Sequence, residues 1–148
     1  MKITLTRYYQ DRYITKSRMS IDGEPFCEAR EPGTQCGSCC QGVRRPRMLK
    51  DGTYSCKCVS SDDAPMTLTV CQTAGHNRIT FGWHPLQQWK ANRIFIGEAD
   101  PYDPPAEREL REQESTFAAF AHLLYRAYGT REAITLTVNS LSTCLATN

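Results

Sequence analysis

The sequence has few of the features that point quickly to a functional class. It contains no apolar run near the roughly 20 residues that a membrane-spanning helix needs. Its formal net charge is only +2, which is too small to indicate a nucleic-acid partner or a membrane surface. The first residues alternate between polar and apolar and lack the apolar core of a secretion signal. We therefore expect a protein that is cytoplasmic on synthesis, with no membrane insertion and no nucleic-acid binding. Later assembly into a virion or a secreted particle is compatible with these absences.

A nucleophile is also missing where the sequence offers a base. An apolar run ends at His84, and after a polar span a second apolar run begins at Arg93. A histidine at a strand end, facing a second strand, is a common place for a base beside a nucleophile. The second run begins with arginine and supplies no serine, threonine or cysteine. His84 is alternatively a packed strand-end residue, or part of a small ligand pocket between tryptophans. The candidate binding residues are Trp83, His84, Trp89 and Arg93.

The pattern of apolar residues predicts a β-rich chain. With 148 residues, of which 40% are apolar, the chain suits one domain, 1–148, with a hydrophobic core. Asp22-Gly23 separates two alternating runs and is a strong signal for a tight hairpin turn. The predicted strands are 2–9, 14–21, 24–31, 52–59, 66–71, 77–83, 93–96 and 133–139. The tetrapeptide Ile-Thr-Leu-Thr occurs at 3–6 and at 134–137, which we interpret as two strands with the same burial pattern.

One amphipathic helix is expected near 106–128, before the final strand. Its apolar stripe is Leu110, Phe117, Phe120, Ala121, Leu124 and Tyr128. Gly129 stands where a C-terminal cap belongs. The fold class is therefore β-rich α+β: a mostly antiparallel sheet or partly closed barrel with one C-terminal amphipathic helix followed by a final strand.

The eight cysteines suggest a metal site. Cys36 and Cys39 are separated by two residues, and Cys56 and Cys58 share one face if they lie in a strand. Together they could bind one structural zinc ion through four sulfurs, with Cys40 as an alternative to Cys39. The other interpretations are free buried thiols, or disulfides if the protein matures outside the cell.

The predicted hairpin carries a distinctive motif, Ile-Asp-Gly-x-x-Phe-Cys, with the residues Thr15, Ile21, Asp22, Gly23, Phe26, Cys27 and Glu31. Further motifs follow at Gly52 to Tyr54, His84-Pro85 and 94–98. Together they resemble those of a family of small uncharacterised bacterial and phage proteins that begin with such a hairpin, and the likeness covers nearly the whole chain.

The family's strand pair with histidine and Gly-Cys is similar to that of L,D-transpeptidase-like cysteine enzymes acting on peptidoglycan. Here Asn92-Arg93 occupies the Gly-Cys position, so no thiol is available there for a covalent step. The resemblance therefore implies a non-catalytic structural or binding protein of a phage particle or phage-like assembly, with protein partners or self-assembly. The alternative is a peptidoglycan-directed cysteine hydrolase or L,D-transpeptidase-like enzyme that is degenerate in this member.

Overall fold

The computed structural model describes residues 1–12, 14–33, 49–60, 66–71, 79–82, 93–99 and 110–142. Eight strands and one helix lie within these ranges. The elements are β1 (Lys2–Gln10), β2 (Ile14–Ile21), β3 (Glu24–Pro32), β4 (Gly52–Val59), β5 (Thr67–Val70), β6 (Ile79–Gly82), β7 (Arg93–Gly97), α1 (Gln113–Gly129) and β8 (Ile134–Ser140). Within the described part of the chain, no helix is long and apolar enough to cross a bilayer.

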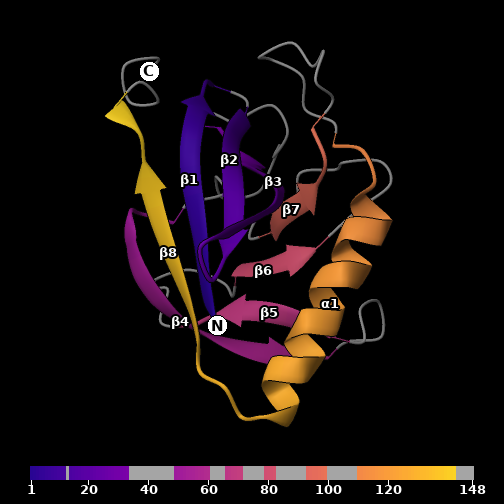
Figure 1. Ribbon diagram of the computed structural model, residues 1–148. Coiled ribbons are helices and arrows are strands. Elements are labelled where there is room, and N and C mark those ends of the chain that lie inside the picture. Colours follow the sequence, from indigo (N-terminus) through magenta and orange to yellow (C-terminus); the bar gives the residue numbers. More distant parts are fainter. Residues whose placement is uncertain are drawn as a thin grey trace, which may run out of the picture.

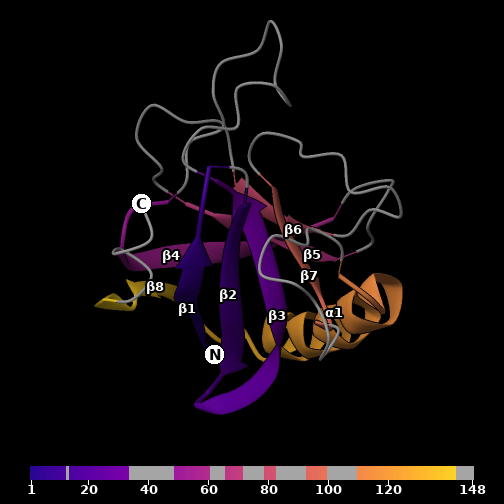
Figure 2. The ribbon, with the colours of Figure 1, turned by 90° about the horizontal axis from the view of Figure 1, so that it is seen from above.

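The strands form a closed barrel in the order β1-β2-β3-β7-β6-β5-β4-β8 (Figure 1). The pairs β1–β8 and β6–β7 are parallel, and the other neighbours are antiparallel. Seen from above, β1, β2 and β3 form one wall of the barrel (Figure 2). The β-rich fold with one helix is confirmed, and the sheet closes fully.

The predicted hairpin is present between β2 and β3. Asp22 has φ 50° and Gly23 has φ 85°, so both turn residues are left-handed. This is the backbone of a tight turn whose twist matches that of the flanking strands. The Asp22 carboxylate also accepts a hydrogen bond of 2.8 Å from the Lys2 backbone N–H, which ties the turn to β1.

A β-bulge follows close to the turn. Met19 pairs with Cys27, but the next residue, Ser20, pairs with Pro25, so Phe26 is an extra residue in β3. Phe26 and Cys27 both pack against the hydrophobic core although they are adjacent in sequence. The bulge accounts for this, because regular alternation would place one of them outside.

The two Ile-Thr-Leu-Thr segments lie side by side in the closing strand pair. Ile3 pairs with Leu136 and Leu5 with Val138, so the two copies are offset by two residues. All four side chains are fully buried, which confirms the shared burial pattern. Parallel pairing between the segments was not predicted.

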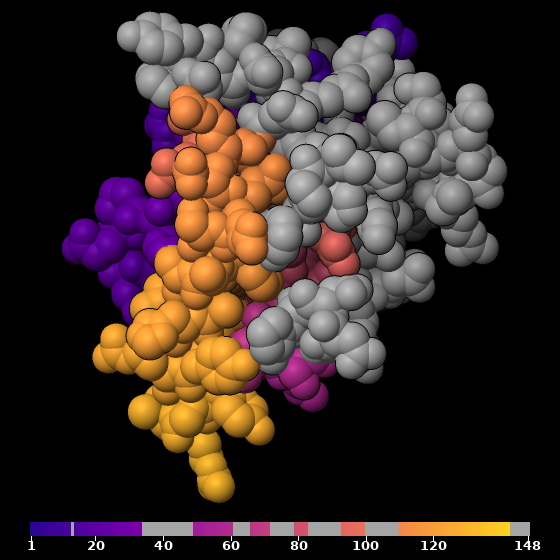
Figure 3. Space-filling view, turned by 90° about the vertical axis from the view of Figure 1, so that its right-hand side faces the viewer, coloured from indigo at the N-terminus to yellow at the C-terminus, as the bar shows by residue number. Residues whose placement is uncertain are grey.

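The helix begins later than predicted. Leu110 and Arg111 are outside α1, and Arg111 forms an isolated bridge with Glu98 of the segment that follows β7. Glu112 precedes the helix in a left-handed conformation, with φ 52°. Residues 101–109 lie outside the described ranges. The outer side of α1 forms part of the molecular surface (Figure 3).

The buried face of α1 covers the apolar part of the barrel beside β5 and β7. The ring of Phe120 is fully buried, with its centroid 6.1 Å from that of Phe26 and 5.4 Å from that of Phe81. Leu124 is also fully buried, as predicted. Tyr128 is 65% exposed, so its placement on the buried stripe was wrong. Ala127, one residue earlier in α1, is buried in place of Tyr128.

The left-handed residue that follows α1 lies two residues beyond the predicted position, after the C-cap residue Thr130. Gly129 is the last helical residue, and the left-handed residue is Arg131, with φ 55°. The N–H of Arg131 donates to the carbonyl of Tyr128, and the N–H of Glu132 donates to that of Ala127. This is the hydrogen-bond pattern of a Schellman motif, with arginine where glycine is favoured.

Candidate functional site

Of the predicted binding residues, Arg93 alone lies within the described ranges; Trp83, His84 and Trp89 lie outside them. Arg93 is half-buried at the start of β7, opposite Thr80 of β6. A Cβ added to Gly82 would lie 2.8 Å from Cδ of Arg93 and 3.1 Å from its Nε. The arginine side chain therefore runs along β6 and occupies the space that Gly82 leaves free. Its planar guanidinium could bind a carboxylate through two hydrogen bonds.

The parallel pairing of β6 and β7 sets the position of Arg93 along the strand direction, relative to Gly82. Gly82, at the end of β6, pairs with Phe95 and not with Arg93. Strands rise by about 3.3 Å per residue, so the backbone at position 93 lies roughly 7 Å from the level of Gly82. This offset could not be predicted from the sequence, because nothing in the apolar runs distinguishes a parallel pair from a hairpin.

Cys56 and Cys58 both lie on the inner face of β4, as expected for alternate residues of a strand. Both pack against the hydrophobic core, and the Cys58 thiol donates to the carbonyl of Leu124 at 3.8 Å. Cys36 and Cys39, the other predicted zinc ligands, lie outside the described ranges. The described residues contain no group of three or more side chains arranged to hold a metal ion. The zinc site stays a prediction, and the inward orientation of Cys56 and Cys58 is unfavourable to it.

Burial keeps several thiols protonated. It raises the pKa of Cys56 to about 12, and the neighbouring Cys71 and Cys58 add smaller upward contributions. Burial raises the pKa of Cys27 to about 12 as well, and it raises that of Cys58. The thiolate is the reactive form of cysteine, so these groups are poor nucleophiles at neutral pH.

A charged cluster that was not predicted from the sequence lies near the ends of β1, β3 and β8 and the start of β4. Its Arg7–Glu31 pair is buried, whereas Asp51 is half-exposed. Nε and Nη2 of Arg7 donate to the two carboxylate oxygens of Glu31, at 3.0 and 2.8 Å. Nη1 of Arg7 lies 3.4 Å from Oδ1 of Asp51. Asp51 in turn accepts hydrogen bonds from the backbone N–H and the hydroxyl of Ser140, at 2.9 and 2.8 Å. The cluster thus joins four strands through side chains.

A signal for this cluster was present in the sequence. Arg7 continues the alternation of Ile3 and Leu5, so it occupies a third inward position of β1. The side chains of Arg7 and Glu31 are only 5% and 3% exposed. A charged pair this deeply buried needs close hydrogen bonding on both sides, and the bidentate geometry supplies it.

A second polar group lies on the outer face of β1, β2 and β3. The Tyr8 hydroxyl donates to Glu28 at 2.9 Å, and the same Glu28 oxygen accepts from Nη1 of Arg30 at 3.0 Å. The guanidinium of Arg18 lies 4.8 Å from the centre of the Tyr8 ring. Burial, followed by the negative charge of Glu28, raises the pKa of Tyr8 to about 12. These contacts hold the three strands together through their side chains.

Comparison with protein families, curated sequences and solved structures gave no match to this chain.

Proposed function

We propose that the chain is a non-catalytic structural or binding protein, and that it serves as a component of a phage particle or a phage-like assembly. The observation that carries the proposal is Arg93. The resembling family has cysteine at this position, whereas here an arginine extends along β6 over Gly82. A bulky, permanently charged side chain cannot replace the nucleophile of a cysteine enzyme.

The state of the thiols supports the same proposal. Cys27, Cys56 and Cys58 are at least partly buried against the core, and their pKa values are raised by burial. Reactive cysteines lie instead in electropositive, partly exposed surroundings that lower the thiol pKa. The inner face of the barrel thus uses cysteine as a small apolar residue.

An acidic protein segment is the partner chemistry that best suits Arg93, since arginine binds carboxylates in a bidentate manner. The partner could belong to another protein or to another copy of this chain. A single half-exposed charge pair contributes at most about 1 kcal/mol, so the remaining affinity must come from the surrounding surface.

A peptidoglycan assay tests the catalytic alternative directly. Purified sacculi are incubated with the protein, and released or cross-linked muropeptides are measured by chromatography. We expect no turnover above that of heat-denatured protein. Turnover that is lost in His84→Ala and after thiol alkylation would overturn the proposal and support a peptidoglycan-directed cysteine enzyme.

A binding assay tests the role of Arg93. We expect a fluorescent deca-glutamate peptide to bind more tightly than deca-lysine, with an affinity that falls as salt is added. Arg93→Glu should weaken deca-glutamate binding about fivefold, as expected for one lost charge pair and a new repulsion. Arg126→Glu changes the charge equally on the exposed side of α1 and is the matched control. Equal losses in both variants would mean that net charge, and not position 93, determines binding.

A further inference from the structure

We propose that two copies of this chain can exchange β8, so that the β8 of each copy fills the place between β1 and β4 of the other. This inference rests on the proposed structural role and deepens it, because it identifies a second copy as partner and names the element exchanged. It is drawn from the position of β8, from its anchoring contacts and from the connection that precedes it.

The place that β8 occupies is specific for this strand. On one side β8 pairs in parallel with β1, from Lys2↔Thr135 to Arg7↔Ser140. On the other side it pairs antiparallel with β4, from Gly52↔Val138 to Cys56↔Ile134. Its inward side chains Ile134, Leu136 and Val138 are 5%, 0% and 0% exposed. Only a segment with this alternation can restore the core, which favours the same strand from a second copy over an unrelated one.

Both ends of β8 are held by contacts outside the strand ladder. The N–H of Thr135 donates to the carbonyl of Met1 at 3.1 Å, and that of Leu141 donates to the carbonyl of Arg7 at 2.9 Å. Ser140 is bound by Asp51, as described above. An exchanged β8 would re-form all these contacts with the other barrel, so the barrel contacts are the same in both forms.

The connection from α1 to β8 is the part that differs between the two forms. It consists of residues 130–133 and contains Arg131 at φ 55°. In a residue with a Cβ, this conformation is strained. Opening the connection would let Arg131 return to an extended conformation, while the hydrogen bonds of the Schellman turn would be lost. Short, strained connections of this kind favour strand exchange.

A paired-cysteine experiment detects the exchange. The outward side chains of Thr53 and Thr137 face each other on β4 and β8, with their hydroxyl oxygens 3.1 Å apart. Thr53→Cys and Thr137→Cys are introduced in separate full-length chains that carry different tags. The two proteins are mixed at high concentration, with and without joint unfolding and refolding, and are then mildly oxidised. Mass spectrometry should find the 53–137 disulfide between chains, because only exchange brings these positions together.

Thr4→Cys and Ser20→Cys provide the matched control pair. These positions face each other on β1 and β2, which stay together in the same chain whether or not β8 is exchanged. They should give no linkage between chains above that of the native cysteines in the unsubstituted protein. Equal linkage for both pairs would show random collision and would overturn the proposal.

Two substitutions in the connection should change the yield of the 53–137 linkage in opposite directions. Arg131→Gly removes the left-handed strain from the unexchanged form and should lower the yield of the 53–137 linkage several-fold. Arg131→Val increases the strain and should raise the yield. A 53–137 linkage that responds to neither substitution would contradict the role of the connection.

Light scattering on the unmodified chain separates this inference from the proposed function. Self-association without any 53–137 linkage between chains would refute strand exchange and leave the structural role intact. Turnover of peptidoglycan would refute the structural role whatever the linkage.

Discussion

The C-terminal end of α1 offers a direct test of the backbone energetics. Gly129 occupies the last helical position, whereas Arg131 occupies the left-handed position that glycine would favour. We predict that the double substitution Gly129→Ala and Arg131→Gly stabilises the protein, because it moves the glycine to the residue that needs it.

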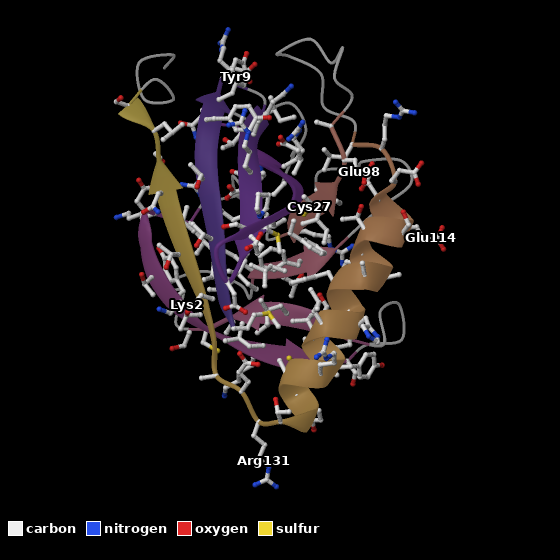
Figure 4. The ribbon with its side chains drawn as sticks, in the orientation of Figure 1. Lys2, Tyr9, Cys27, Glu98, Glu114 and Arg131 are labelled. Atoms are coloured by element: carbon white, nitrogen blue, oxygen red, sulfur yellow. The ribbon has the colours of Figure 1, made fainter. Side chains whose placement is uncertain are left out.

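The size of the effect follows from the two sites. A Cβ added to Gly129 has no atom within 4 Å, so alanine can be accommodated without a clash. Glycine in a helix costs about 0.5–1 kcal/mol relative to alanine. At position 131, the left-handed conformation costs a residue with a Cβ about 1–2 kcal/mol, which Arg131→Gly recovers. Glycine also has more freedom in the unfolded chain, and this reduces the gain by roughly 0.5–1 kcal/mol. The Arg131 side chain points away from the barrel, so its loss should remove little else (Figure 4). The double variant should gain about 1–2 kcal/mol in the free energy of unfolding.

Chemical denaturation and calorimetry measure this gain. For a chain of this size, we expect the midpoint of thermal unfolding to rise by about 3–6 °C. Arg131→Ala keeps the Cβ and should change stability little. Gly23→Ala, at φ 85° with open space around it, should destabilise through the backbone alone. If Arg131→Ala stabilised as much as Arg131→Gly, the gain would come from loss of the arginine side chain and the argument from backbone conformation would fail.

Three further predictions concern the core. Glu31→Gln should cost about 3 kcal/mol in denaturant titrations, because the buried guanidinium of Arg7 loses its bidentate carboxylate partner and is left with the 3.4 Å contact to the half-exposed Asp51. The joint change Arg7→Met with Glu31→Leu should cost less than Glu31→Gln alone; a larger loss in the joint variant would contradict this. Phe120→Ala should cost about 3–5 kcal/mol, since the ring is fully buried among other aromatic rings; a loss under 1 kcal/mol would show that α1 contributes little to the core. The pKa of Cys27 is raised from 9.0 to about 12, so above pH 9 the folded state holds a proton that the unfolded state releases, and the free energy of unfolding should fall as pH rises from 9 to 12. Cys27→Ala should show a shallower fall over that range. An unchanged slope in this variant would refute the role of Cys27.

The sequence predicted the strands well because local patterns determine them. Asp22-Gly23 and the alternation in 3–6 and 134–137 depend on neighbouring residues only, and the structure confirms both. The order of strands in the barrel depends on contacts distant in sequence, and no local pattern reports it. For the same reason, the parallel pairing that positions Arg93 was not foreseen.

The misplaced features share a different cause. Arg7 was overlooked because charged residues are usually exposed, whereas the alternation of β1 correctly indicates that position 7 faces inward, as positions 3 and 5 do. The cap was assigned to Gly129 because glycine usually marks a helix end, whereas here Arg131 tolerates the left-handed conformation. For Arg7, the tertiary pairing with Glu31 outweighs the usual preference of a charged residue for the surface. For Arg131, the local hydrogen bonds of the Schellman turn outweigh the usual preference for glycine.

The closing strand pair has a consequence for how the chain folds. β1 and β8 are joined residue by residue, from Ile3↔Leu136 to Leu5↔Val138, although these partners are about 130 positions apart in sequence. The hairpin of β2 and β3 can form early, since its loop is short, but the barrel cannot close before almost the whole chain is available. At a synthesis rate of about 5–20 residues per second, roughly 7 to 27 seconds pass between the synthesis of β1 and that of β8, the neighbour that completes its hydrogen bonding. Closure should therefore be the slow folding step of this protein, and it depends on residues at opposite ends of the described chain.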